Sequence, residues 1–217
     1  MEERQIIQQT ADHVRSLLSG EGTGHDWFHI ERVRHTALAM AREEAADLFV
    51  VELAALLHDV ADWKFAGGDH EAGPRQARQW LQALNVSPAT IDHVASIIAS
   101  LSFKGAGVPT LMATLEGQCV QDADRLDALG AIGIARAFAY GGQKGQGLYD
   151  PDHPPTPHDS FEAYKKGSSS TINHFYEKLL LLQDRMNTAT GKRLAAARHQ
   201  VMQWYLEQFF AEWKGTR

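Results

Sequence analysis

An adjacent His58-Asp59 pair stands near the end of a strongly apolar stretch of the sequence, about Leu48 to Val60. Such a stretch predicts a central, buried helix. A carboxylate and an imidazole in this low-dielectric position are costly unless something pairs them. A divalent cation would do so directly, because aspartate supplies negative charge and neutral histidine supplies a nitrogen ligand. The other interpretation is a structural pair that the backbone or an arginine satisfies.

A second acidic group lies downstream, where Asp122, Asp124 and Asp127 fall within six residues of one another. The same segment carries the apolar residues Val120 and Leu126, so part of it is expected to face the core. Carboxylates this close repel one another unless a cation or arginines offset their charge. The segment is therefore either a further part of a metal site or a solvated acidic face.

The order of these residues resembles the HD-domain superfamily of metal-dependent phosphohydrolases, which is named for the His-Asp pair. The pattern of that family is a histidine, then the His-Asp pair, then a more distant aspartate. Here these residues are His29, His58-Asp59, and Asp124 in the sequence Ala-Asp-Arg-Leu. Over its whole length the chain resembles the small stand-alone bacterial members of the family, some of which are nucleotide pyrophosphohydrolases.

The resemblance implies an all-helical fold and one divalent metal ion, held by His29, His58, Asp59 and Asp124. Two neutral imidazoles and two carboxylates balance the charge of such an ion and leave positions for water and a phosphate oxygen. Mn²⁺ is the expected ion, with Mg²⁺, Co²⁺, Ni²⁺, Fe²⁺ and Zn²⁺ as alternatives. Helical geometry leaves Asp122 as a rival for the fourth position, while the Ala-Asp-Arg-Leu context favours Asp124.

Other residues receive roles from the same resemblance. His25 or Asp26 is expected to orient the metal ligands. Asp62, beyond the His-Asp pair, is expected to act as the general base, or else to cap the end of the helix. Four side chains are expected to contact substrate phosphate: Lys64, Arg125, His174 and Lys178. Surface salt bridges, or for His174 a position in the core, are the alternatives. A second metal site at His70 and His93 stays outside the expected ligand set.

The elements that must position these residues are helices. Almost every long segment has helical periodicity and none alternates like a half-buried strand, so the sequence predicts an all-α fold. The expected helices cover about 2–18, 26–44, 48–60, 75–84, 88–101, 110–129, 132–140, 161–165, 172–183 and 190–213. The glycine- and proline-rich segment 141–160 is expected to form a mobile lid over the substrate.

A length of 217 residues fits one compact domain, here an HD-domain-like helical bundle over 1–217. The metal-ligand core is expected at about 25–130, and the helices at about 160–213 are expected to complete the site.

The composition narrows the function further. A formal net charge of −6 disfavours a nucleic-acid-binding role, and the single cysteine, Cys119, excludes an internal disulfide. The acidic start of the sequence and the lack of a long apolar run predict a cytoplasmic protein without a membrane anchor. The expected partner is a small phosphate compound or nucleotide, and the oligomeric state stays open.

The leading hypothesis is a metal-dependent phosphohydrolase that acts on such compounds, for example splitting a nucleoside triphosphate into monophosphate and pyrophosphate. The alternative is a catalytically silent regulatory module that binds metal or nucleotide.

Overall fold

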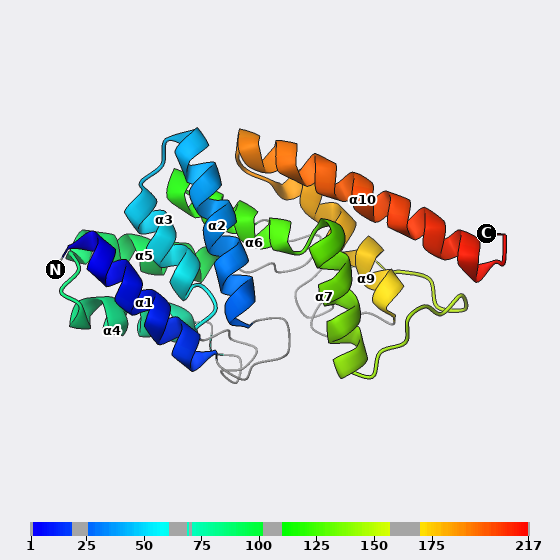
Figure 1. Ribbon diagram of the computed structural model, residues 1–217, viewed down its shortest axis with the longest axis horizontal. Coiled ribbons are helices and arrows are strands. Elements are labelled where there is room, and N and C mark those ends of the chain that lie inside the picture. The colour runs from blue at the N-terminus through cyan, green and yellow to red at the C-terminus, as the bar shows by residue number, and fades with distance from the viewer. Residues whose placement is uncertain are drawn as a thin grey trace. The chain divides into compact units, whose positions relative to one another are not determined.

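The fold is helical, as the periodicity predicts. The computed structural model describes residues 2–18, 26–60, 69, 71–101, 110–156 and 170–216. Every regular element in these ranges is a helix (Figure 1), and one isolated bridge pairs Gly147 with Ser170. The prediction of an all-α fold is therefore confirmed. The described residues group into two compact units, one up to residue 123 and one from residue 124 onward. The single-domain organisation stays a prediction.

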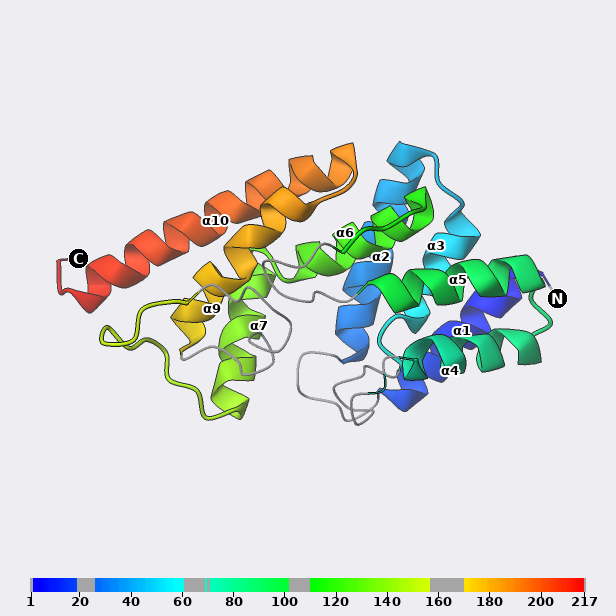
Figure 2. The same cartoon turned by 180° about the vertical axis from the view of Figure 1, so that it is seen from behind.

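The first unit is built around one buried helix. Its elements are α1 (Glu3–Leu17), α2 (Trp27–Glu44), α3 (Leu48–Leu57), α4 (Ala72–Ala83) and α5 (Pro88–Ser100). Helix α3 packs against α1, α2 and α5, and α4 packs against α5 (Figure 2). Seven of the ten residues of α3 are buried: Val50, Val51, Leu53, Ala54, Ala55, Leu56 and Leu57. This confirms the central position predicted for the apolar stretch.

Local signals fix where α2 and α3 end and begin. Ala45 adopts a left-handed conformation with φ 58°, which ends α2, and the Asp47 side chain then accepts hydrogen bonds from the Phe49 and Val50 N–H groups to start α3. Because so short a connection joins two packed helices, they form a hairpin and run in opposite directions. The amino end of α2 therefore lies at the same end of this hairpin as the carboxyl end of α3.

The second unit contains α7 (Gly130–Gln143), α9 (Thr171–Glu177), the 3₁₀ helix η1 (Leu179–Arg185) and α10 (Ala189–Trp213). Helix α7 packs against α9 and α10, and η1 packs against α9 and α10. Phe175 is fully buried, and its ring stacks on Tyr205 and contacts Phe138. Helix α6 (Leu115–Asp127) contains the boundary between the two groups of residues.

Several predicted helix ends differ from the observed ones by up to three residues, and two predicted helices differ by more. The expected helix at 172–183 is broken at Lys178, which has φ −141° and ψ −60°, and a 3₁₀ helix follows. A 3₁₀ helix has three residues per turn, so it brings Leu179 and Leu182 to one buried side. The expected helix at 110–129 begins only at Leu115, because the Thr114 hydroxyl accepts a hydrogen bond from the Gly117 N–H and marks its start.

Part of the predicted lid is held by α9. The Asn173 side chain donates a hydrogen bond to the His153 carbonyl at 2.7 Å, and the Thr156 N–H donates to Glu177 Oε1 at 3.0 Å. Asn173 and Glu177 are both buried. Residues 157–160 of the predicted lid, and the predicted short helix at 161–165, lie outside the described residues.

The turn from α6 to α7 requires glycine at two positions. Gly130 has φ 70°, a conformation that other residues adopt only with strain. A Cβ atom on Gly133 would meet the backbone carbonyl of Ala128, which cannot move aside as a side chain can.

We expect the Gly133→Ala substitution to lower the free energy of unfolding by about 2 kcal/mol, because the added methyl forces the backbone of this turn to shift. Urea unfolding followed by circular dichroism measures this loss. Gly117→Ala is the matched control, because the added atom there would meet mainly the flexible end of Met112 and should cost less than about 1 kcal/mol. Equal losses in the two variants would contradict this account of the turn.

Among the residues that the structure describes, no helix combines the length and the apolar character that a membrane span requires.

Candidate metal centre

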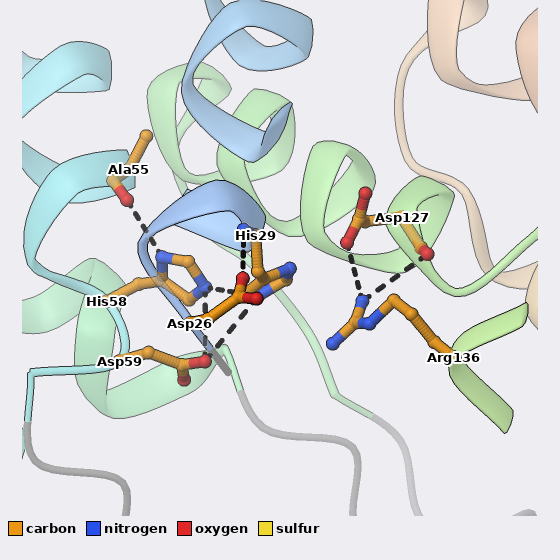
Figure 3. Close-up of polar contacts among 7 residues, drawn as sticks. All are labelled: Asp26, His29, Ala55, His58, Asp59, Asp127 and Arg136. Carbon is orange, nitrogen blue, oxygen red and sulfur yellow. Dashed lines mark hydrogen bonds and ion pairs between the residues drawn. The ribbon is translucent and has the colours of Figure 1, made fainter. Parts of the chain in front are cut away.

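Three of the four predicted metal ligands come together at the end of the α2–α3 hairpin (Figure 3). The Nε2 atoms of His29 and His58 are 3.3 Å apart. Asp59 Oδ2 lies 3.5 Å from His29 Nε2 and 3.7 Å from His58 Nε2. The two nitrogens and one carboxylate oxygen thus surround a common point.

His29 owes its position to the start of α2. It is the third residue of the helix, and Asp26 Oδ1 accepts a hydrogen bond from the His29 N–H at 2.9 Å. This N-cap fixes the first turn of α2 and with it the direction of the His29 side chain. Asp26 thus orients a predicted ligand through the backbone. His25, the other residue considered for this role, lies outside the described residues.

His58 directly follows the last residue of α3, and its ring is locked by that helix. His58 Nδ1 lies 2.8 Å from the carbonyl oxygen of Ala55. A carbonyl can only accept, so Nδ1 carries the hydrogen and donates it. In the neutral ring, Nε2 is then left with a lone pair that faces His29 and Asp59. A backbone carbonyl is one of the partners by which proteins fix the tautomer of a metal-binding histidine.

The spacing of these atoms fits a bound ion. Two ligand atoms that each lie about 2.1 Å from one metal ion are roughly 3.0–3.4 Å apart at bond angles from 90° to 110°. The two histidine nitrogens meet this condition at 3.3 Å, and the carboxylate oxygen lies slightly farther out. His29 is fully buried and His58 is 8% exposed, so a cation here would be largely shielded from water. Two imidazoles and a carboxylate are donors that suit divalent transition metals.

The acidic segment on α6 contains both candidates for a fourth ligand. Asp122 is fully buried and Asp124 is partly exposed. Asp122 belongs to the first group of residues and Asp124 to the second. Residues two apart on an α-helix point about 200° apart, so the two carboxylates face nearly opposite sides of α6.

Asp127, the third acid of this segment, is neutralised by an arginine. Arg136 of α7 donates to Asp127 Oδ2 at 2.6 Å and to the Asp127 carbonyl at 3.3 Å (Figure 3). Arg198 of α10 donates to the neighbouring Leu126 carbonyl. The sequence shows that the negative charge of these acids must be offset. It does not show which cationic side chains lie nearby, because Arg136 and Arg198 come from other helices.

Cys119 does not offer a thiolate to a metal. Burial first, and then the nearby acids Glu44, Asp122 and Glu116, together raise the pKa of its thiol to about 12. The thiol therefore stays protonated at neutral pH, whereas a metal ligand must be deprotonated.

The predicted substrate contacts lie in different surroundings. Arg125 is 6% exposed and donates a hydrogen bond to the Arg185 carbonyl, which gives part of its guanidinium a structural role. His174 lies on α9 and Lys178 directly follows it, both partly exposed. Their predicted roles toward phosphate stay predictions. Asp62, Lys64 and His70 lie outside the described residues.

His93 is placed at a junction between helices. Its Nε2 atom lies 2.9 Å from the Thr114 hydroxyl and 3.7 Å from Glu116 Oε2. Glu116 Oε1 also accepts a hydrogen bond from the Asp47 N–H, at the start of α3. These contacts tie α5, α6 and α3 together in the first unit.

An ion pair that the sequence did not reveal joins the two ligand-bearing helices. Arg34 of α2 donates through Nε to Glu52 Oε1 of α3 at 2.8 Å, and its Nη2 donates to the same oxygen. Both side chains are about one-fifth exposed. The pair fixes α2 against α3 within the hairpin, and therefore fixes His29 relative to His58.

We expect Arg34→Ala to weaken Mn²⁺ binding about threefold and to lower the free energy of unfolding by about 1 kcal/mol, because the hairpin loses this link. Calorimetric titration and urea unfolding measure the two effects. Arg78→Ala is the matched control: it removes a more exposed pair with Asp92 that joins α4 to α5, and Mn²⁺ affinity should not change. A double variant with the charges exchanged, Arg34→Glu with Glu52→Arg, should restore part of the affinity. Equal Mn²⁺ affinity in Arg34→Ala and the native protein would contradict the positioning role.

Comparisons with known proteins match this chain to one family model and to a relative of nearly the same length. The family model for the HD domain matches residues 27–129, the segment that contains the three clustered ligands and Asp124. The Bacillus subtilis protein YpgQ is 40% identical over 209 residues, which cover 96% of this chain and 94% of YpgQ.

Solved structures agree over almost the full length. The crystal structure of Bacillus subtilis YpgQ in complex with ADP has a TM-score of 0.78 at 38% identity, covering 98% of this chain and 97% of that one. An HD-superfamily hydrolase from Bacillus thuringiensis has a TM-score of 0.78 at 43% identity, with 98% and 99% covered. A Lactobacillus plantarum protein reaches a TM-score of 0.87 at 40% identity, with 99% of each chain covered.

Proposed function

From the premise that this chain belongs to the HD-domain family, we propose that it is a metal-dependent phosphohydrolase acting on nucleotides or related small phosphate compounds. The observation that carries the proposal is the convergence of His29, His58 and Asp59 on one point, with two histidine nitrogens 3.3 Å apart. The similarity to an HD-superfamily hydrolase from Bacillus thuringiensis supports the assignment to the hydrolases.

The proposed ion is Mn²⁺, held by the three clustered side chains together with Asp124. A bound divalent ion would supply an activated water nucleophile near neutral pH and would neutralise phosphate charge. The chain itself prepares the site in two ways. The Ala55 carbonyl keeps the lone pair of His58 on Nε2, and the burial of His29 and His58 keeps bulk water away from the donors.

The remaining proposed roles concern protons and phosphate oxygens. Asp62 is proposed as the general base that accepts a proton from the attacking water. Cationic or hydrogen-bonding side chains are proposed to hold the phosphate oxygens: Lys64, Arg125, His174 and Lys178.

A nucleotide is the proposed substrate class. Support comes from the YpgQ crystal structure, which contains ADP and matches nearly all of this chain. Among reactions on nucleotides, we propose cleavage of a nucleoside triphosphate to the monophosphate and pyrophosphate.

The test is an activity assay in which the metal and the products are both controlled. The purified protein is stripped with a chelator and then supplied with Mn²⁺, Mg²⁺, Co²⁺, Ni²⁺ or Zn²⁺ and a panel of nucleoside mono-, di- and triphosphates. Ion-exchange chromatography separates monophosphate, diphosphate, phosphate and pyrophosphate. Metal-dependent release of monophosphate and pyrophosphate is expected. Metal and nucleotide binding without hydrolysis of any compound would instead identify a catalytically silent regulatory module.

A further inference from the structure

The ring that precedes the first metal ligand is exposed. Phe28 is the second residue of α2, and 62% of its surface is exposed, whereas the adjoining His29 is fully buried. We propose that Phe28 is the platform on which the base of a bound nucleotide stacks. This inference rests on the proposed function, because it assumes that the phosphates of the nucleotide lie at the metal centre.

Phe28 is more exposed than the other Phe and Trp side chains described in the first unit. Trp27 is buried with the Arg15 guanidinium over its ring at 5.9 Å, and Trp80 stacks on His13 at 3.8 Å. Among the described residues of this unit, the large hydrophobic side chains that are exposed are Leu17, Phe28, Leu48 and Leu111. Phe28 is the only aromatic one in that set. A phenylalanine that faces water forgoes the stabilisation that burial would give, and its ring face is open to a ligand.

The position of Phe28 on α2 suits a base rather than the phosphates. Successive residues of an α-helix point about 100° apart, so the side chain of Phe28 points in a different direction from that of His29 and does not occupy the position of the ion. In a nucleotide, the ribose separates the base from the phosphates. With phosphates at the ligands, the base therefore lies away from the ion, and in this proposal it stacks on the flat apolar ring at the amino end of α2.

Stacking also sets the expected selectivity. Every nucleobase has a π face, so a single phenylalanine platform accepts all of them with little discrimination. The site should therefore distinguish nucleotides from phosphate compounds that lack a base, and distinguish only weakly between purine and pyrimidine nucleotides.

The experiment separates base binding from phosphate binding. Isothermal titration in the presence of Mn²⁺ compares α,β-methylene-ADP, which resists hydrolysis, with methylenediphosphonate, which has no base. We expect Phe28→Ala to weaken binding of the ADP analogue roughly tenfold and to leave binding of methylenediphosphonate within about twofold. Phe28→Trp should retain the affinity for the ADP analogue. Leu111→Ala, which removes another exposed apolar side chain of the same unit, is the control and should change neither affinity.

Several outcomes would overturn the inference. Equal weakening of both ligands in Phe28→Ala would mean that the ring shapes the metal centre instead of binding a base. Unchanged affinities of Phe28→Ala for both ligands would mean that the ring does not bind the base. This holds whether or not size-exclusion chromatography shows a change in oligomeric mass. Absence of binding of the ADP analogue to the native protein would also overturn it. Failure of the proposed hydrolysis is distinguishable from all of these, because the titration reads binding and not turnover.

Discussion

Replacing His58 by alanine is expected to abolish metal-dependent hydrolysis, with a loss of at least about 10³-fold in kcat/KM. His58 supplies one of the two nitrogens that lie 3.3 Å apart, and its lone pair is fixed by the Ala55 carbonyl. Its removal leaves His29 and Asp59 without the ligand nitrogen that lies near both of them. Phosphate release from the preferred nucleotide, measured across a Mn²⁺ series, gives the size of the loss.

A second measurement on the same variant does not depend on turnover. An ion that binds only the folded protein stabilises it by about 2.7 kcal/mol at a concentration of 100 times its Kd. Mn²⁺ should therefore raise the Tm of the native protein and not that of His58→Ala. His35→Ala is the matched control, because His35 is an exposed histidine on the helix that carries His29. If His58→Ala kept both the activity and the Mn²⁺-induced rise in Tm, the proposed metal centre would be wrong.

Asp124→Asn is expected to weaken Mn²⁺ binding by about 10²-fold and to lower hydrolysis by a comparable or larger factor, because an amide replaces a charged ligand. Asp122→Asn is the control, because it also removes one carboxylate from α6. Both residues lie on α6 and face nearly opposite sides of it, so the two carboxylates do not bind one ion equally. We expect Asp122→Asn to change stability more than metal affinity, since Asp122 is fully buried.

The pair of variants decides between the two acids directly. Calorimetric titration with Mn²⁺ gives the affinity of each variant, and circular dichroism confirms that each is folded. The opposite pattern, with affinity lost in Asp122→Asn and kept in Asp124→Asn, would assign the fourth ligand to Asp122.

Helical periodicity was sufficient to predict the helices of the first unit, because their apolar faces and their caps are local features of the sequence. The break at Lys178 was not predictable in the same way. Over seven residues, the apolar spacings of an α-helix and a 3₁₀ helix are nearly the same, so only packing decides between them.

In the candidate site too, local features could be predicted from the sequence and contacts between helices could not. The cost of an unpaired His58-Asp59 pair beside an apolar helix can be read from the sequence, and it indicated a cation. The link between Arg34 and Glu52, and the neutralisation of Asp127 by Arg136, join different helices. Each of these arginines has several acids within a plausible distance along the chain, and the tertiary fold alone selects one.

The hairpin of α2 and α3 has a consequence for the order in which the proposed metal site forms during folding. The three clustered ligands fall within 29–59, and the two helices that carry them are joined by a short connection. Contacts between segments close in sequence form early in folding, since little chain entropy is lost in closing them. We therefore expect the three clustered side chains to meet early in folding, ahead of contacts with helices that lie farther along the chain.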